Sequence, residues 1–128
     1  MLDNLLPIDP EVAARVEALD LQFNKFGVDP FGIDKDELTR SVSAFAWIYR
    51  FYFKVDVYGL ENVPSRGRAV LIGNHSGGVA IDAMMVMGSM LLDASPPRLP
   101  HGMIDKFIHE FPGASQFMAR TGQFTGNP

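Results

Sequence analysis

The sequence predicts an α/β domain with a mainly parallel sheet flanked by helices and preceded by two N-terminal helices. The main observation is the order of three adjoining segments: an apolar run at 69–72, a glycine-rich polar stretch at 73–78 and a long apolar run at 81–92. This order is typical of a buried strand, a turn and a buried helix. Shorter segments on both sides extend it to β-β-α-β-α-β, which favours a parallel sheet.

The composition narrows the class of protein. The 128 residues fit one domain, and the lack of cysteine excludes a disulfide framework and a thiol nucleophile. The net charge of −4 is uneven: residues 1–37 carry nine acids and three bases, whereas the rest carries six acids and eight bases. This mildly basic body suits an anionic substrate but lacks the dense Lys/Arg stripe that nucleic-acid binding needs, so we expect no nucleic-acid partner.

The two N-terminal helices are predicted from capping signals and apolar spacing. The Asp-Pro-Glu sequence at 9–11 is typical of a helix start, and apolar residues at helical spacing extend that helix over roughly 10–25. Asp34 or Asp36 is expected to cap a second helix that runs to about Val55.

The second predicted helix is apolar over most of its circumference, and Trp47 interrupts its narrow polar line. Two interpretations remain open. The helix packs against the sheet of its own domain, or it lies in a membrane interface with its aromatic residues at the level of the lipid headgroups. Residues 1–54 are therefore treated as one N-terminal helical region. No stretch of 18 residues is free of charge, so no transmembrane helix is predicted.

Residues 55–128 are predicted to form the first part of the α/β domain. Because the chain stops after an apparent strand, and a parallel strand needs covering on both faces, we expect it to be the front part of a longer protein. The expected strands lie at 56–59, 69–73, 98–103 and 122–125, and the expected helices at 80–92, 105–110 and 112–120.

The glycine-rich stretch carries the candidate catalytic residues. His75 follows the predicted buried strand, where open α/β sheets place their sites, and Asp82 falls in the first turn of the next helix. A carboxylate that orients an imidazole makes the imidazole a general base. The alternative is that Asp82 only caps its helix and that His75 is a surface residue.

Other kinds of site fit this stretch less well. Ser76 is a weak candidate nucleophile, because the G-x-S-x-G elbow needs glycine where Asn74 stands. A phosphate-binding P-loop would need Gly-Lys-Ser/Thr after the glycines. His101 and His109 show no spacing that suits a metal, so we expect no metal and no cofactor.

The stretch Asn-His-Ser-Gly-Gly at 74–78, preceded by Val-Tyr-Gly-Leu-Glu-Asn-Val-Pro at 57–64, resembles the first block of the phospholipid/glycerol acyltransferase family over roughly 55–82. The resemblance implies the N-terminal portion of a glycerolipid acyltransferase fold. It implies a membrane-associated O-acyltransferase of lipid metabolism, peripheral at the cytoplasmic face. Such an enzyme moves a fatty acyl group from acyl-CoA or acyl-carrier protein to a glycerolipid or other lipid hydroxyl.

By the same resemblance, His75 deprotonates the acceptor hydroxyl and Asp82 holds the imidazole, without an acyl-enzyme, a metal or a cofactor. The His-to-Asp spacing is two residues longer than the usual family spacing. The second family block maps onto 122–127 without its arginine, which argues against glycerol-3-phosphate as acceptor. The residues expected to bind substrate are Asn74, Ser76, Gly77, Gly78, Arg120 and Gly122.

Several alternatives stay open. One alternative hypothesis is a non-catalytic lipid-surface module or a degenerate relative. Another is a thioesterase or hydrolase that uses His75 and Asp82. We expect residues 1–128 alone to be inactive. The methionines of the predicted helix 80–92 border an acyl-chain groove or simply fill the core. The cations considered for an anionic group, otherwise solvated surface charges, are Arg98, Lys106 and Arg120.

Overall fold

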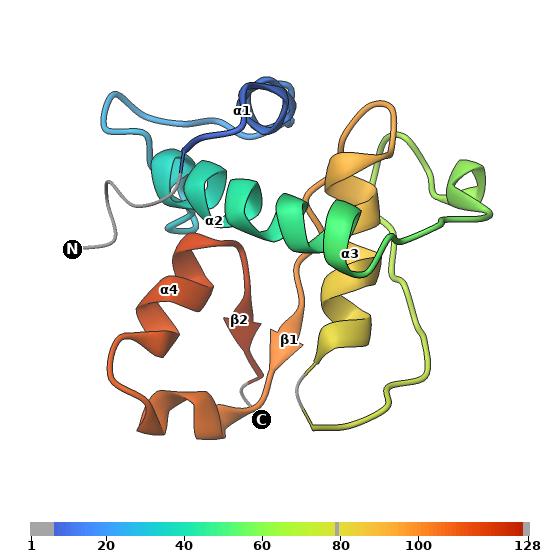
Figure 1. The fold of residues 1–128 in the computed structure, drawn as a ribbon. Helices are drawn as coiled ribbons and strands as arrows, with labels where there is room; N and C mark the ends of the chain where they lie inside the picture. The colour runs from blue at the N-terminus through green and yellow to red at the C-terminus, as the bar shows by residue number, and fades with distance from the viewer. Residues whose placement is uncertain (1–6, 79, 127–128) are drawn as a thin grey trace.

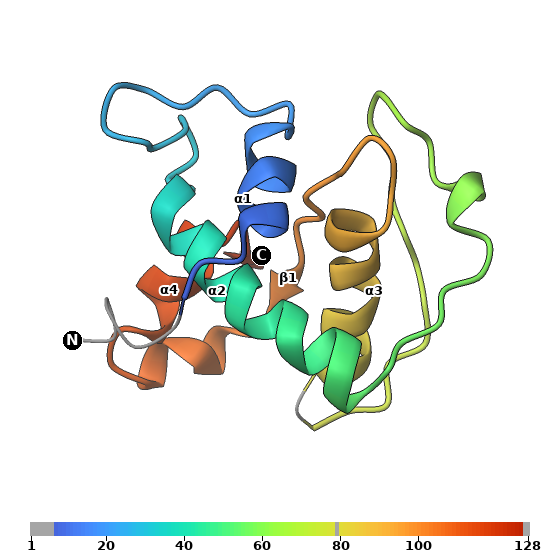
Figure 2. The same ribbon diagram turned by 45° about the horizontal axis from the view of Figure 1, so that its top comes forward.

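The computed structural model describes residues 7–78 and 80–126, and the fold is mostly helical. Figure 1 shows helix α2 running across the molecule, with α4 and strands β2 and β1 beneath it and helix α3 crossing near its C-terminal end. Figure 2, turned by 45°, keeps the order from α4 through β1 to α3. The elements are α1 (Pro10–Glu17), α2 (Lys35–Trp47), η1 (Ile48–Tyr52), η2 (Leu60–Asn62), α3 (Ile81–Leu92), β1 (Met103–Ile104), η3 (Lys106–Glu110), α4 (Ala114–Arg120) and β2 (Phe124–Thr125).

Both N-terminal helices begin at their predicted caps. The Asp9 carboxylate accepts a hydrogen bond from the Glu11 N–H, and the Asp34 carboxylate accepts one from the Glu37 N–H at 2.9 Å. Each bond satisfies a backbone donor that has no partner within the helix. Asp34, rather than Asp36, is therefore the cap of α2.

Helix α1 ends at Glu17, well before the predicted end near residue 25. Beyond it, Leu19, Leu21 and Phe23 occur at every second position, and all three pack in or against the core. An extended chain brings alternate residues to one side, whereas a helix would turn Leu21 away from the other two. The helix therefore ends at Glu17, because packing Leu19, Leu21 and Phe23 on the same side requires an extended chain.

The core lies between the two N-terminal helices and the C-terminal half of α3. Its buried members are Val12, Val16, Leu19, Ile33, Leu38, Ala46, Tyr49, Leu91 and Leu92. Polar bonds add to this contact: Arg15 Nε donates to the Leu91 carbonyl at 2.6 Å, and the Tyr49 hydroxyl donates to Asp93 Oδ2 at 2.6 Å. A cation at a helix C-terminus is also favoured by the helix dipole. Helix α3 is thus attached to the N-terminal helices at the end opposite Asp82.

The methionines of α3 have different environments. Met90 is buried, Met85 packs against the core and Met84 is exposed. Core packing therefore accounts for part of this methionine-rich sequence, and the acyl-chain groove stays a prediction.

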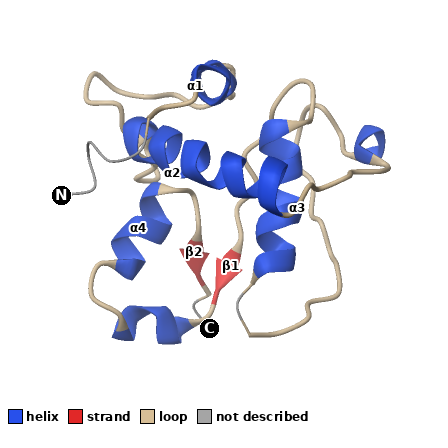
Figure 3. Cartoon of the chain, in the orientation of Figure 1, coloured by secondary structure: helices blue, strands red, loops and turns tan. Residues whose placement is uncertain are grey.

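Among the described residues, the predicted mainly parallel sheet is present only as one small pair. β1 and β2 are parallel, with Met103 opposite Phe124 and Ile104 opposite Thr125, and η3 and α4 form the crossover between them. Figure 3 shows this pair as the two red arrows between α4 and α3. The parallel arrangement near the predicted segments 98–103 and 122–125 is therefore confirmed, although each strand has only two residues.

The predicted strands at 56–59 and 69–73 are wrong for the structure described. Neither segment pairs with a strand in the described part of the chain, and the segment 70–72 is exposed, with Ile72 at 94%. A strand needs a neighbouring backbone to receive its hydrogen bonds, and an apolar run alone does not supply one. The chain leading to His75 is therefore an exposed extended segment.

The C-terminal end of α2 differs from the rest of the helix. Leu38, Thr39, Ser43 and Ala46 are buried, whereas an exposed cluster of large side chains extends from Trp47 through the π-helical segment η1 to Phe53, with the buried Tyr49 excluded. We call this cluster the aromatic patch; it consists of Trp47, Ile48, Phe51, Tyr52 and Phe53. The packing interpretation thus describes the first part of the helix. Within 7–78 and 80–126, no helix has the length and apolar character needed to cross a bilayer.

Candidate active site

His75 and Asp82 are in hydrogen-bond contact. Asp82 lies in the first turn of α3, and His75 lies in the segment that precedes this helix. His75 Nδ1 is 2.9 Å from Asp82 Oδ1 and 3.1 Å from Oδ2. The six intervening residues therefore still allow the two side chains to meet.

The Asp82 carboxylate is also held by two backbone groups. The Ser76 N–H donates to Oδ2 at 2.8 Å, and the Ala83 N–H donates to Oδ1 at 2.8 Å. These two bonds, followed by the bond to His75, hold the pKa of the carboxyl well below its usual range. An ionised carboxylate accepts hydrogen bonds only, so the contact favours the tautomer with the proton on Nδ1. Nε2 of His75 is then left with a free lone pair.

Two glycines allow the chain to turn between His75 and Asp82. Gly77 has φ +82° and Gly78 has φ +69°, a left-handed conformation that L side chains adopt only with strain. No atom lies within 4 Å of a Cβ built on either residue, so the backbone conformation, rather than crowding, calls for glycine. The open space also lets another molecule approach this backbone closely.

The carboxyl of Asp82 is expected to titrate below the ordinary aspartate pKa of about 3.9. A pKa lowered by folding means that the carboxylate contacts stabilise the loop above about pH 4 and are lost as the pH falls further. In His75→Ala the pKa should stay low, because the two backbone donors contribute more than the imidazole. A carbon-13 NMR titration of the Asp82 carboxyl checks this. A midpoint at the ordinary aspartate value of about 3.9 would contradict the described geometry.

The remaining predicted site residues are divided between two places. Asn74, Ser76, Gly77 and Gly78 lie in the loop with His75. Arg120 instead donates to Glu37 of α2 at 2.8 Å, and the Gly122 carbonyl is 2.6 Å from Nδ1 of His101. In Figures 1 and 3, α4 and α3 lie on opposite sides of the β1–β2 pair. The structure thus does not bring Arg120 to the His75 loop.

A surface hollow that the sequence did not indicate lies beyond the carboxyl ends of both strands. Its volume is about 510 Å³, and its lining comprises Met103, Ile104, Asp105, Lys106 and Gly126. In Figure 1 both arrows point toward the same end of the molecule as the start of α3. Ligands of open α/β sheets bind outside the carboxyl ends of the strands, so the hollow lies on the side of this strand pair where such ligands bind. Among the described residues, no group of three or more His, Asp or Glu side chains suits a metal ion.

Comparison with known proteins gives one family and a small set of relatives. The family model described as acyltransferase matches residues 54–128, which confirms the predicted family. An uncharacterized protein of Mycobacterium leprae (strain TN) is 34% identical over 62 residues, and uncharacterized proteins of Mycobacterium bovis and Mycobacterium tuberculosis are 33% identical over 64 residues. Each match covers 48% of this chain and 17% of the relative. No solved structure matches the chain significantly.

Proposed function

The chain belongs to the acyltransferase family, and from this premise we propose that it carries the general base of an O-acyltransferase acting on lipids. The donor is acyl-CoA or acyl-carrier protein, and the acceptor is the hydroxyl of a glycerolipid or another lipid. The observation that carries the proposal is the contact between His75 Nδ1 and the Asp82 carboxylate at 2.9 Å. The matched segment spans about a sixth of the relatives' length, so the activity is proposed for the natural protein that contains this chain.

In the proposed reaction, Nε2 of His75 takes the proton of the acceptor hydroxyl. The hydroxyl oxygen attacks the thioester carbonyl, an ester C–O bond forms and the C–S bond breaks. The leaving thiolate then receives the proton from the imidazolium, so the histidine returns to its starting state. Asp82 keeps the Nδ1 proton in place and stabilises the positive charge that develops on the ring. The His75 side chain is 51% exposed, so an acceptor can reach it.

The surroundings of His75 support a site for acyl donor and acceptor. The open backbone at Gly77 and Gly78 gives space for the thioester beside the base. The hollow at the strand ends is lined by other residues than the His75 loop; it carries Lys106, for which the described residues provide no ion pair. A cation there suits an anionic headgroup or donor.

An acceptor-dependence assay tests this function. The natural protein, incubated with acyl-CoA, is expected to release free CoA only when a lysophospholipid or another lipid hydroxyl is added, with the acyl group recovered on that lipid. CoA release without an acceptor would contradict transfer and support the thioesterase alternative. No CoA release with any lipid acceptor would support the non-catalytic module.

We also propose that the aromatic patch contacts the cytoplasmic face of a membrane. Trp47 and Tyr52 are the residue types that favour the headgroup level, and both side chains are largely exposed. The Trp47 and Phe51 ring centroids lie 6.2 Å apart, and the Tyr52 and Phe53 ring centroids lie 4.9 Å apart, so the patch contains two pairs of neighbouring rings. This placement would bring a lipid acceptor to the enzyme.

Removing the patch is expected to weaken membrane binding. The double variant Trp47→Ala/Phe51→Ala should lose about tenfold or more in partitioning to phospholipid vesicles, because each large side chain contributes about 1.5–3 kcal/mol when fully buried. Vesicle co-sedimentation measures this effect. The matched control is Phe26→Ala/Phe31→Ala, which removes two rings that are even more exposed, from the connection between α1 and α2. Equal losses in the two double variants would contradict a specific role for the patch.

A further inference from the structure

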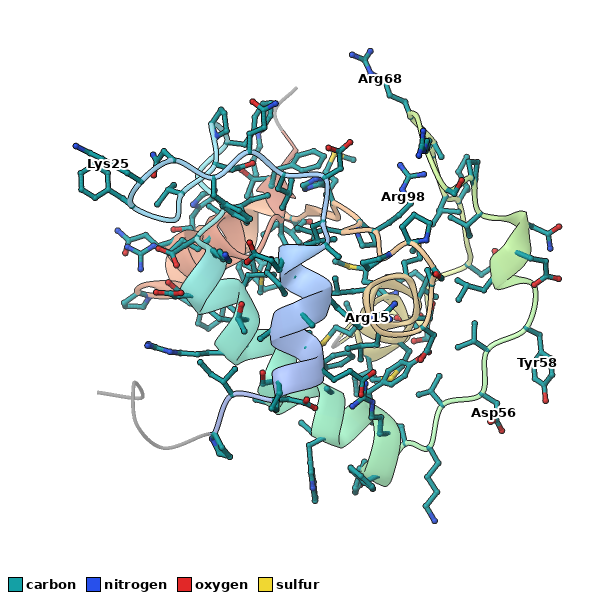
Figure 4. All side chains as sticks on the ribbon, turned by 90° about the horizontal axis from the view of Figure 1, so that it is seen from above. Arg15, Lys25, Asp56, Tyr58, Arg68 and Arg98 are labelled. Atoms are coloured by element: carbon teal, nitrogen blue, oxygen red, sulfur yellow. The ribbon has the colours of Figure 1, made fainter. Side chains whose placement is uncertain are left out.

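Arg98 connects the two halves of the His75–Asp82 site. Its backbone N–H donates to the Met90 carbonyl of α3 at 3.0 Å. Its guanidinium donates through Nη1 to the Pro64 carbonyl and through Nη2 to the Gly67 carbonyl, the latter at 2.6 Å. Figure 4 shows the labelled Arg98 side chain beside this part of the chain. One residue therefore joins the helix that carries Asp82 to the segment that carries His75.

The segment before His75 has few other attachments. Val55 and Val57 still pack against the core, but residues beyond them are largely exposed, and 69–73 pairs with no strand in the described part of the chain. Without Arg98, the last packed residue before His75 would be Val57. The chain would then run freely for roughly 18 residues, from 57 to 75, and an Arg98 anchor at residue 67 shortens this to roughly 8.

We propose that Arg98 is a positioning residue for the proposed general base. The His75–Asp82 contact divides the chain between the anchored residue and α3 into two parts, and Arg98 shortens only the part before His75. By the 3/2-power dependence of loop closure, this favours the contact about 1.5-fold. Arg98 acts at one end of α3 and Asp82 at the other. The helix between Asp82 and Met90 rises about 12 Å, which the extended segment from Gly67 to His75 spans easily. The importance of Arg98 for catalysis rests on the function proposed above. Its effect on the His75–Asp82 contact does not depend on that function.

The chemistry of the contact requires arginine. Two separate carbonyl oxygens, those of Pro64 and Gly67, are bound by two nitrogens of one rigid, planar group. A lysine ammonium is a single point on a flexible chain and does not reproduce this fork. The Arg98 guanidinium is therefore engaged by two backbone carbonyls, and its use as a cation for an anionic group stays a prediction.

The test compares Arg98→Ala and Arg98→Lys with Arg68→Ala. Arg68 belongs to the same segment and carries the same charge, but its side chain points away from the body in Figure 4. Long-range proton–nitrogen NMR spectra of His75 report its tautomer directly. We expect Arg98→Ala, and more weakly Arg98→Lys, to lower the population of the Nδ1–H tautomer, whereas Arg68→Ala leaves it unchanged. Circular dichroism checks that each variant is folded. If Arg98→Ala does not fold, the comparison of Arg98→Lys with Arg68→Ala decides the question.

Activity gives the second readout. In the natural protein, Arg98→Ala is expected to lower kcat about 1.5-fold, with the KM for acyl-CoA unchanged, and Arg68→Ala should leave both unchanged. An unaltered His75 tautomer in the folded Arg98 variants would overturn the positioning role. A tautomer change in a protein that shows no acyl transfer would instead retain the role of Arg98 and contradict the proposed function.

Discussion

Replacing His75 by alanine is expected to lower kcat for acyl transfer about a thousandfold, because positioned general-base catalysis contributes about 10²–10⁴-fold. The KM for acyl-CoA should change little, since the lost interaction acts on the acceptor proton in the transition state. Steady-state kinetics of the natural protein with a lipid acceptor measure the effect. Folding should be preserved, because the His75 side chain is half exposed and lies outside the core.

His109→Ala is the matched control for this substitution. His109 is an exposed histidine of η3, and it is not part of the described His75–Asp82 contact. We expect its replacement to leave both kinetic constants unchanged. Equal activity of His75→Ala and the unaltered protein would rule out His75 as the base.

Replacing Asp82 by asparagine is expected to lower kcat about a hundredfold. The amide is nearly isosteric with the carboxylate, but one of its two polar atoms is a donor. The carboxylate accepts hydrogen bonds from His75 and from the N–H groups of Ser76 and Ala83. In the variant the amide nitrogen faces at least one of these donors, so that hydrogen bond is lost. The ring then loses its tautomer preference or its orientation.

Asp56→Asn controls for the loss of a carboxylate. Asp56 lies in the segment before His75, and Figure 4 shows its side chain directed outward. Its replacement should not change kcat. If Asp82→Asn matched the unaltered protein in kcat, Asp82 would only cap its helix, as one interpretation of the sequence allowed.

Local sequence signals predicted the features that depend on neighbouring residues. Asp9 and Asp34 cap the helices that follow them, and α3 occupies nearly the whole predicted range 80–92. The turn through Gly77 and Gly78 brings the base and the carboxylate together because both side chains belong to one short loop. Each of these features depends on residues that lie within about ten positions of one another in the sequence.

Features that depend on distant parts of the chain were not predictable in the same way. The apolar run at 69–73 has the composition of a buried strand, yet burial requires a partner that the run itself does not specify. Arg98 contacts carbonyls more than thirty residues away, and backbone carbonyls leave no sequence signature. Arg120 resembled a substrate ligand in sequence, but its partner Glu37 comes from the other end of the chain.

The central claim is that His75 and Asp82 act as one general base, and a double-mutant cycle tests it most directly. The cycle compares kcat for His75→Ala, Asp82→Asn and the double variant in the natural protein. If Asp82 acts only through His75, the double variant should be no slower than His75→Ala alone, because residues that act as a unit are not additive. A double variant slower than His75→Ala by the full factor of Asp82→Asn would show independent roles and contradict the account.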